Sequence, residues 1–202
     1  GFKHTGLSRE QAVNWKTAAE LIKNANRKIS VLNLFAYTGG ATVACLKAGA
    51  DVTHVDASKG MVLWAKENAV QSGVAERNVR WLVDDCLKFV KREIRRGKKY
   101  DAIIMDPPSY GRGPNGEVWK LEQQLNELLG SVGELLSDNP LFFMLNSYTG
   151  GLSPTILNYM VKTLVIKNRS GKVYTDEIGL NVTARDVTLP CGNTTYWISD
   201  NG

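Results

Sequence analysis

The chain has 202 residues, a length that suits one domain with its own hydrophobic core and no need of disulfides or metal ions to fold. Hydrophobic residues make up 43% of it and charged residues 22%, which excludes a largely disordered chain. No apolar run approaches the ~20 residues of a membrane-spanning helix. The net charge of +5 permits an anionic partner but does not require one.

Cysteine and histidine are sparse and scattered along the chain. The three cysteines, Cys45, Cys86 and Cys191, are odd in number and far apart, so they do not suggest disulfide pairs. Free thiols of this kind are typical of a reducing cytoplasm. His4 and His54 are too few and too isolated to form a zinc site. We therefore expect a cytoplasmic protein without a metal centre.

Strand-like and helix-like segments alternate through most of the chain. Ser8 and Gln11 have the spacing of a capping box at the start of the first predicted helix. The Pro/Gly-rich stretch 106–117 predicts a loop, and its part GRGPNGE, at 111–117, is expected to be mobile and can act as a lid. The predicted strands are 30–36, 51–56, 79–84, 100–105 and 140–146. The predicted helices are 8–25, 40–48, 58–72, 86–96, 118–136 and a sixth from Ser153-Pro154 onward.

The end of the chain has a different pattern. Segments 172–182 and 187–199 are rich in β-branched and aromatic residues, with too few residues between them for a crossover helix. They are predicted to pair as an antiparallel β-hairpin. Five βα units followed by this hairpin predict a three-layer α/β fold with a mostly parallel, seven-stranded sheet. We expect one domain over residues 1–202, and its abrupt start, GFKHTG, suggests a piece of a longer protein.

The first predicted strand runs into a turn that contains Gly39 and Gly40. Glycines at a strand-to-helix turn let the backbone approach a ligand at the N-terminus of a helix. The spacing differs from the Gly-x-Gly-x-x-Gly of dinucleotide-binding folds, so it does not indicate a pyrophosphate. A tight turn that needs glycine for steric reasons alone explains the pattern equally well.

Acidic residues follow the next two strands. Asp56 ends the second strand about 20 residues beyond the glycine turn, where a carboxylate can accept both hydroxyls of a ribose. Asp84 and Asp85 end the third strand, where a carboxylate can accept an adenine amino group and the N–H of Cys86 can meet a ring nitrogen. The alternative is a role at the start of a helix. Asp56 would be a charge at a helix N-terminus beside Ser58, and Asp84 or Asp85 would cap the helix that begins at Cys86. With the glycine turn, they predict a nucleoside-containing cofactor without a pyrophosphate.

The fourth strand breaks into Asp106-Pro107-Pro108-Ser109-Tyr110. Two prolines fix the backbone directly after a buried strand, at the edge of the sheet where ligands bind in open α/β folds. A flat, amino-bearing base can stack on Tyr110 and donate hydrogen bonds to Asp106 and to the carbonyl of Pro107. An ordinary rigid loop is the alternative.

These motifs together resemble a known family. NLFAYTGG at 33–40, VDAS at 55–58, VDDC at 83–86 and DPPSY at 106–110 are similar to motifs of the class I S-adenosylmethionine-dependent methyltransferases. The resemblance is strongest to the group that methylates bases of large-subunit ribosomal RNA, and it covers almost the whole chain. Segment 5–11 is similar to that group's TGxFxDQ segment, with Gln11 as its best-matched position.

The resemblance implies S-adenosylmethionine as the cofactor and gives roles to individual residues. It implies that Gln11 approaches the methionine end, Asp56 the ribose, and Asp85 with the Cys86 backbone the adenine. The implied cofactor-binding residues are Gln11, Phe35, Ala36, Tyr37, Thr38, Gly39, Asp56, Ala57, Ser58, Asp85 and Cys86. The implied catalytic residues, which would face the substrate, are Asp106, Pro107, Pro108 and Tyr110.

The methylated atom depends on the nucleophile that the site can activate. A ring or exocyclic nitrogen needs only positioning and a proton acceptor such as Asp106. Carbon 5 of a pyrimidine needs attack by a cysteine thiolate, which relatives that act on cytosine carry just after the fifth strand. The matching stretch 145–149 contains no cysteine, and Cys191 is interpreted as a buried structural thiol on the hairpin. We therefore expect methylation of an RNA base, ribosomal RNA above all, at nitrogen.

Basic residues give weaker indications of a partner. The run 91–99 is the densest basic patch, but it precedes the fourth strand and falls at the edge opposite the ligand edge, where a solvated helix end explains it. Arg112 and Lys120 flank the glycine-rich loop and can meet phosphates. Two alternatives stay open: a methyltransferase of a small molecule or protein on the same fold, and a non-catalytic nucleotide-binding module.

Overall fold

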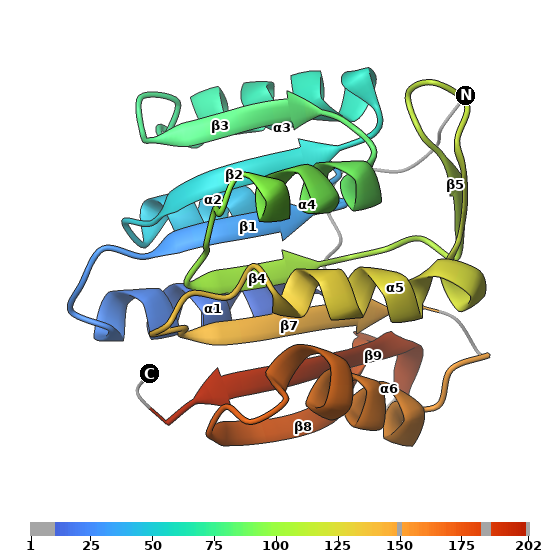
Figure 1. Cartoon of the computed structure of the whole chain (residues 1–202). Helices are drawn as coiled ribbons and strands as arrows, with labels where there is room; N and C mark the ends of the chain where they lie inside the picture. The colour runs from blue at the N-terminus through green and yellow to red at the C-terminus, as the bar shows by residue number, and fades with distance from the viewer. Residues whose placement is uncertain (1–10, 149–150, 183–186, 201–202) are drawn as a thin grey trace.

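A computed structural model describes residues 11–148, 151–182 and 187–200 of the chain. A central sheet lies between two layers of helices (Figure 1). One face of the sheet is covered by α1 (Ala12–Asn24), α2 (Gly40–Lys47) and α3 (Lys59–Gln71). The other face is covered by α4 (Cys86–Arg95), α5 (Leu121–Gly133), α6 (Pro154–Met160) and the π-helical continuation of α6 (Val161–Ile166).

The sheet has seven strands in the order β3-β2-β1-β4-β7-β9-β8. The parallel strands are β1 (Ser30–Leu34), β2 (Asp51–Asp56), β3 (Val79–Val83), β4 (Ala102–Met105) and β7 (Phe142–Ser147). The last two strands, β8 (Gly171–Val182) and β9 (Val187–Ser199), form an antiparallel hairpin, and β9 also pairs antiparallel with β7. The predicted three-layer fold, with its mostly parallel sheet and terminal hairpin, is confirmed.

The two faces of the sheet bury separate hydrophobic cores. Successive strand residues point to opposite faces, so the continuous apolar strands supply both cores at once. Phe143 on β7 packs into the core under α4 and α5, whereas its neighbour Phe142 packs into the core under α1 and α2. Both rings are fully buried. Burial on both faces holds the strands in place. The site described below lies at their carboxyl ends.

Three local predictions differ from the structure. The helix expected from residue 8 begins at Ala12 in the described part of the chain, with Gln11 at its N-cap position and no side-chain capping bond there. The predicted capping box stays a prediction, because its partner Ser8 lies outside the described residues. The expected mobile loop contains a small antiparallel hairpin, β5 (Tyr110–Arg112) with β6 (Val118–Lys120). For this reason α5 begins at Leu121 instead of residue 118. The turn between β5 and β6 is closed by a hydrogen bond from the N–H of Gly113 to the carbonyl of Glu117 (2.7 Å), which a glycine-rich composition does not reveal.

The three cysteines differ in accessibility. Cys45 and Cys86 are buried, and burial raises the pKa of the Cys45 thiol to about 12 and that of Cys86 well above its usual value. Cys191 is partly exposed, so its interpretation as a buried thiol is wrong. It lies two residues before Asn193, the β9 partner of Ser147 at the end of β7. The β9 strand therefore brings Cys191 to the ligand edge of the sheet.

This difference predicts a simple labelling pattern. At about pH 8, an aromatic disulfide reagent should react quickly with one thiol of the native protein and with all three after unfolding, because only an accessible thiolate attacks. Cys191→Ser should abolish the fast phase, and Cys45→Ala should leave it intact. Rapid reaction of more than one thiol in the native protein would contradict the described burial.

Candidate active site

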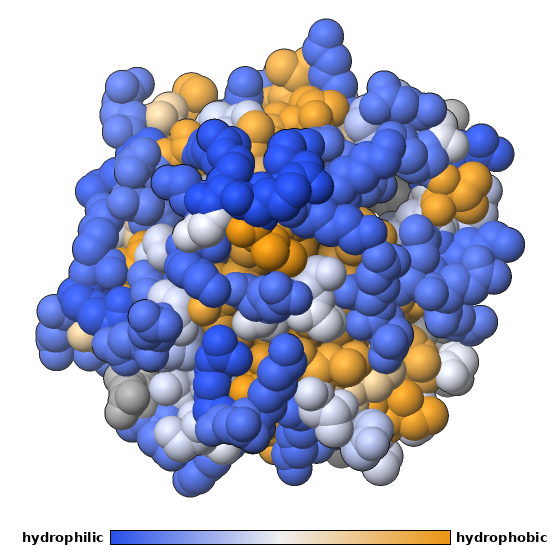
Figure 2. Space-filling model, in the orientation of Figure 1, coloured by the Kyte–Doolittle hydropathy of each residue, from blue (hydrophilic) through white to orange (hydrophobic). Residues whose placement is uncertain are grey.

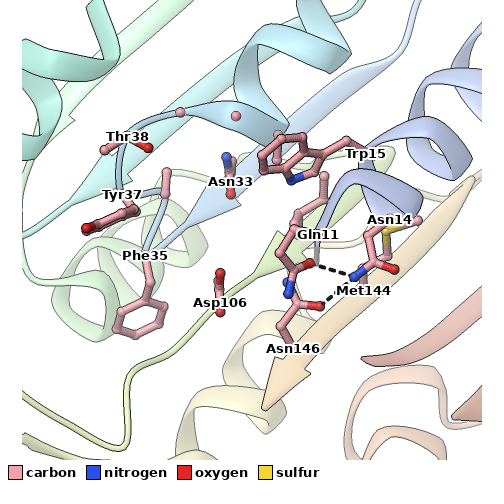
Figure 3. Close-up of a pocket in the computed structure, with 15 residues that line it drawn as sticks. Gln11, Asn14, Trp15, Asn33, Phe35, Tyr37, Thr38, Asp106, Met144 and Asn146 are labelled. Carbon is pink, nitrogen blue, oxygen red and sulfur yellow. Dashed lines mark hydrogen bonds between the residues drawn. The ribbon is translucent and has the colours of Figure 1, made fainter. Parts of the chain in front are cut away.

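The carboxyl ends of the parallel strands meet at one edge of the sheet, where open α/β folds bind their ligands. A pocket lies there, between the strand ends and the beginning of α1 (Figure 3). The predicted site residues that line this pocket are Gln11, Phe35, Ala36, Tyr37, Thr38, Gly39 and Asp106. The others are on the segments that follow β2, β3 and β4 at the same edge, outside the pocket lining: Asp56, Ala57, Ser58, Asp85, Cys86, Pro107, Pro108 and Tyr110.

The turn after β1 has an unusual backbone. Phe35 and Tyr37 have φ angles of +53° and +50°, a left-handed conformation that costs non-glycine residues about 1–2 kcal/mol each. Two hydrogen bonds hold them: the N–H of Phe35 donates to Cys86 Sγ (3.3 Å), and the N–H of Tyr37 donates to Asp56 Oδ2 (2.9 Å). Strain that is held in this way is typical of ligand-binding loops.

Gly39 is required by both backbone conformation and space. Its φ is +80°, and a Cβ there would lie 2.9 Å from the Cβ of Ala65 on α3. The steric interpretation of the glycine turn is therefore correct for Gly39. It does not exclude a ligand, because the same turn lines the pocket and begins α2.

Asp56 connects the β1 turn to α3. Its Oδ2 accepts from the N–H of Tyr37, and its Oδ1 accepts from the N–H of Ser58 (2.8 Å). Ser58 in turn caps α3 by accepting from the N–H of Met61. Burial raises the pKa of Asp56, and the two N–H groups offset part of that rise. Each carboxylate oxygen can accept a second hydrogen bond, so ribose contact stays compatible with this structural role.

Asp84 and Asp85 have separate partners after β3. Asp85 Oδ1 accepts from the N–H of Lys88 (2.8 Å) and caps α4, so the helix-capping alternative is correct for Asp85. Asp84 forms an ion pair with Arg92. The predicted contact of Asp85 and Cys86 with adenine stays a prediction, with Asp85 held in place by its capping bond.

The β5–β6 hairpin connects the segment after β4 to the β1 turn. Trp119 on β6 is buried, and its Nε1–H donates to the carbonyl of Pro108 (2.7 Å). The Trp119 ring packs against Phe35, with ring centroids 5.0 Å apart. Glu117 forms an ion pair with Lys88 on α4 and fixes the hairpin to that helix. The stretch expected to be mobile is thus tied to both sides of the site.

A buried polar network below the pocket was not foreseen from the sequence. Gln11, 1% exposed, accepts from Asn14 Nδ2 (2.6 Å) and donates to the hydroxyl of Tyr148 (2.5 Å). Asn14 also donates to Asn146 Oδ1 (3.2 Å) and to the hydroxyl of Thr194 (2.8 Å). The network joins α1, β7 and β9. The available sequence signal was an asparagine within an apolar strand, in LFFMLNS for Asn146.

Comparison with known proteins assigns the fold and the motifs to a family. A family model described as an S-adenosylmethionine-dependent methyltransferase matches residues 4–151. The chain belongs to the S-adenosylmethionine-dependent methyltransferases. It is 36% identical over 141 residues to a "Ribosomal RNA large subunit methyltransferase K/L" of Shewanella frigidimarina, which covers 69% of this chain and 19% of that protein. The chain thus spans about a fifth of the length of the curated relatives that it matches.

Solved methyltransferases share the whole described fold. An S-adenosylmethionine-dependent methyltransferase from Agrobacterium tumefaciens is 37% identical with a TM-score of 0.92, covering 98% of this chain and 64% of that one. A magnesium protoporphyrin IX methyltransferase from Synechocystis, solved with S-adenosylmethionine bound, is 14% identical with a TM-score of 0.63, covering 95% of this chain and 79% of that one. At 14% identity, the similarity to the Synechocystis enzyme shows only that the two proteins share a fold.

The pocket of this methyltransferase suits its cofactor, S-adenosylmethionine, in its polar lining. Asn33 and Asn146, 2% and 4% exposed, both line the pocket. Within the described residues, no hydrogen bond reaches Asn33 Oδ1 or Asn146 Nδ2. Since both residues line the pocket, these two atoms can pair there with a polar ligand. The roles of individual residues toward the cofactor stay predictions.

The described residues contain no group of three or more His, Cys, Asp or Glu side chains that could hold a metal ion. Of the helices that the structure describes, none is both long and apolar enough to span a membrane.

We expect Trp119 to act as a positioning residue of the methyltransferase. Trp119→Phe keeps a ring against Phe35 but removes the N–H that holds the Pro108 carbonyl. The turnover rate should fall about 10-fold, because small displacements of positioning groups slow group transfer. The Kd for S-adenosylhomocysteine should stay within about twofold, since the pocket is unchanged. Titration calorimetry and single-turnover methyl transfer measure the two quantities.

The matched control is Trp64→Phe, on the outer face of α3, which should change neither quantity. An unchanged turnover rate in Trp119→Phe, or an equal loss of cofactor affinity, would remove the positioning role.

Proposed function

We propose that this methyltransferase transfers the methyl group of S-adenosylmethionine to a nitrogen of an RNA base, with ribosomal RNA as the substrate. The observation that carries the proposal is the segment after β4. Asp106 lines the pocket, Pro107 is buried, and the ring of Tyr110 is 55% exposed at the edge of the site. A carboxylate, a fixed backbone and an exposed aromatic ring together suit a flat base that carries an N–H.

The chemistry follows from these groups. The bound cofactor supplies an electrophilic methyl group on its sulfonium. Asp106 accepts the proton of the attacking nitrogen, and Tyr110 stacks on the base and holds it in line. Since the carbonyl of Pro108 already accepts from Trp119, we assign the second contact with the base amino group to the carbonyl of Pro107. Pro107 and Pro108 keep that carbonyl in one position.

One observation supports nitrogen over carbon as the methylated atom. Residues 145–148 at the end of β7 are Leu-Asn-Ser-Tyr, without the thiol that attack on carbon 6 of a pyrimidine needs. Cys191 is partly exposed and lies two residues before Asn193, the β9 partner of Ser147 at the end of β7. It is therefore the thiol to test for a role in methylation of carbon.

The relatives' name supports ribosomal RNA as the substrate. Arg112 and Lys120 add support, because both are exposed on the hairpin that borders Asp106 and can meet RNA phosphates. The basic run 91–99 ends at the amino end of β4, opposite the site, and does not contribute to the proposal. Since the proposed substrate is ribosomal RNA, which is found in the cytoplasm, we also propose a cytoplasmic location for the protein.

The deciding experiment is transfer of radiolabelled methyl groups to ribosomal RNA isolated from cells that lack the enzyme. Nucleoside analysis then identifies the methylated atom. We expect an N-methylated base, full activity in Cys191→Ser, and methyl transfer at least about 100-fold slower in Asp106→Ala. Absence of transfer to RNA would overturn the substrate, and a carbon-methylated pyrimidine that disappears in Cys191→Ser would overturn the nitrogen assignment.

A further inference from the structure

Another cavity lies at the opposite edge of the sheet, where the parallel strands begin. Its volume is about 290 Å³, room for about ten water molecules at ~30 Å³ each. Residues from the beginnings of β1, β2 and β3 form one side of it, and the end of α4 with the segment before β4 forms the other. It shares no lining residue with the pocket described above. The cavity is therefore a separate place at which a ligand can bind.

A fully buried carboxylate lies in the wall of this cavity. Glu93 on α4 is 0% exposed, and it accepts a hydrogen bond from the hydroxyl of Tyr100 (2.6 Å). It also forms ion pairs with Nη1 of Arg80 on β3 (3.5 Å) and with Nη1 of Arg96 at the end of α4 (3.4 Å). Because a buried carboxylate has to be paired, Glu93 holds both guanidinium groups beside the cavity.

The two arginines keep donors available for a ligand. A guanidinium has five N–H donors, and the contact with Glu93 uses only Nη1 of each arginine. The side chains of Arg80 and Arg96 are 43% and 54% exposed. Arg80 is also held over the ring of Phe89, with its Cζ 5.9 Å from the ring centroid. A guanidinium that is fixed on one side and open on the other is oriented in advance for bidentate contact with a phosphate.

Positive charge exceeds negative charge around the cavity. Lys98 and Lys99 line it, and Lys98 has no ion-pair partner among the described residues. Lys99 donates to the backbone carbonyl of Glu134 (2.6 Å), which does not neutralise its charge. Asp51, the other carboxylate of the wall, pairs with Lys28 (2.9 Å). With the two arginines, five cations surround two carboxylates. The negative end of the α4 dipole offsets only about half a charge, so the cavity favours an anion.

The cavity differs from the rest of the basic run 91–99. Figure 2 shows strongly hydrophilic side chains gathered over α4. There, Lys91 pairs with Glu127 and Arg92 pairs with Asp84, as a solvated helix surface allows. Around the cavity, in contrast, the cations outnumber their carboxylate partners. The end of the run therefore has a role that a solvated helix end does not explain.

The cavity is about one strand length from the candidate active site. Tyr100 lines the cavity and Asp106 lines the pocket, so six residues of extended chain at ~3.3 Å each, about 20 Å, separate the two. Consecutive phosphates of a helical nucleic-acid strand are ~3.4 Å apart along its axis. A nucleic acid that reaches both places must therefore be longer than about six nucleotides.

We propose that this cavity binds a backbone phosphate of the RNA substrate, at a point remote from the methylated base. Arg80 and Arg96 donate to the phosphate oxygens, and Lys98 adds positive charge beside them. The inference rests on the proposed RNA substrate. A phosphate contact carries no base sequence, so its effect is to fix the orientation of a long RNA on the protein and to favour it over a short fragment.

The first test removes two positive charges and measures RNA binding. Arg80→Ala/Lys98→Ala should bind ribosomal RNA about 10- to 30-fold more weakly at ~0.1 M salt than the native protein does. The slope of log K against log salt concentration should become shallower by about 1.4, because each lost contact with a single-stranded phosphate removes ~0.7. The Kd for S-adenosylhomocysteine, measured by calorimetry, should stay within about twofold.

Three further variants separate a local contact from other effects. Lys23→Ala/Lys66→Ala removes two exposed charges from α1 and α3, on the other face of the sheet, and should leave the salt slope nearly unchanged. Arg80→Lys keeps the charge without the guanidinium, so its Kd for RNA should lie between those of the native protein and the double variant. Lys98→Ala alone should change the slope by about 0.7, and it keeps the test valid if Arg80→Ala does not fold.

The second test measures methyl transfer as a function of RNA length. With intact ribosomal RNA, the double variant should raise KM about tenfold and leave kcat unchanged. With the same RNA cut to fragments of about six nucleotides or fewer, the native protein and the variant should have equal kcat/KM, because such fragments do not reach from the pocket to the cavity. Equal losses on intact and fragmented RNA would contradict a remote contact.

The remaining outcomes distinguish the sources of the phosphate and the two proposals. If inorganic phosphate or pyrophosphate binds in a manner that depends on Arg80 and Lys98, while RNA affinity is the same in the variants, the cavity holds a free anion and the RNA contact is wrong. RNA binding that is equal in the native protein and the double variant overturns this inference alone. A native protein that binds no RNA overturns the proposed substrate as well.

Discussion

Replacing Asp106 with alanine should lower the rate of methyl transfer about 100- to 10,000-fold, the usual contribution of a positioned proton acceptor. The structure explains the size of the effect. Asp106 directly follows a buried strand, and its N–H donates to the carbonyl of Leu34 (3.3 Å), so the residue is tied to β1 and cannot drift from the pocket. Asp106→Asn keeps the shape and should lose nearly as much, because an amide does not take up a proton.

Cofactor affinity separates this role from a structural one. The Kd for S-adenosylhomocysteine should stay within about threefold in both variants, as measured by calorimetry. Asp138→Ala is the control, an exposed carboxylate before β7 at the opposite edge of the sheet, and should retain full activity. Normal turnover in Asp106→Ala would rule out its part in the reaction.

Replacing Asp56 with alanine should have its main effect on cofactor binding. The change removes the acceptor for the N–H groups of Tyr37 and Ser58, and with it the predicted ribose contact. Tyr37 then loses the bond that holds its left-handed backbone, so the β1 turn relaxes. We expect the Kd for S-adenosylhomocysteine to rise at least about 100-fold, since hydrogen bonds to a charged group contribute about 1.5–3 kcal/mol each.

Asp51→Ala gives a matched comparison. Asp51 begins the same strand that Asp56 ends, and its carboxylate pairs with Lys28 near the surface. Its loss should leave cofactor affinity unchanged. Asp56→Asn keeps one acceptor oxygen, so its Kd for S-adenosylhomocysteine should lie between those of Asp56→Ala and the native protein. An unchanged Kd in Asp56→Ala would refute both the ribose contact and the support of the turn.

Strong local patterns were enough to predict the order of the main elements. The five parallel strands are short apolar runs that end in acidic, glycine or proline signals, and the final hairpin has too short a connection for a helix. The β5–β6 hairpin was missed because its strands have three residues each and its stability comes from outside them. Trp119 packs on Phe35, and Glu117 pairs with Lys88, contacts between segments that are distant in sequence.

The site was predictable where a motif follows a strand and unpredictable where strands act together. Asp56 ends a strand, and Asp85 and Asp106 each follow one, so their common edge could be expected from topology. Asn33 and Asn146 are 113 positions apart, and their relation depends on the β1–β4–β7 register. The orientation of their amides depends on hydroxyl partners from α2 and β9, which no spacing in the sequence indicates.

The position of β9 between β7 and β8 has a consequence for how the protein is made. Synthesis proceeds from the N-terminus, so the motif residues after β1, β2, β3 and β4 emerge from the ribosome well before Thr194 and Tyr196. A nascent chain can therefore carry every recognisable motif while the amide of Asn146 still lacks the hydroxyl groups that orient it. The amide of Asn146 reaches its final orientation only after β9 has been synthesised and has paired with β7, later than the strands that carry the motifs.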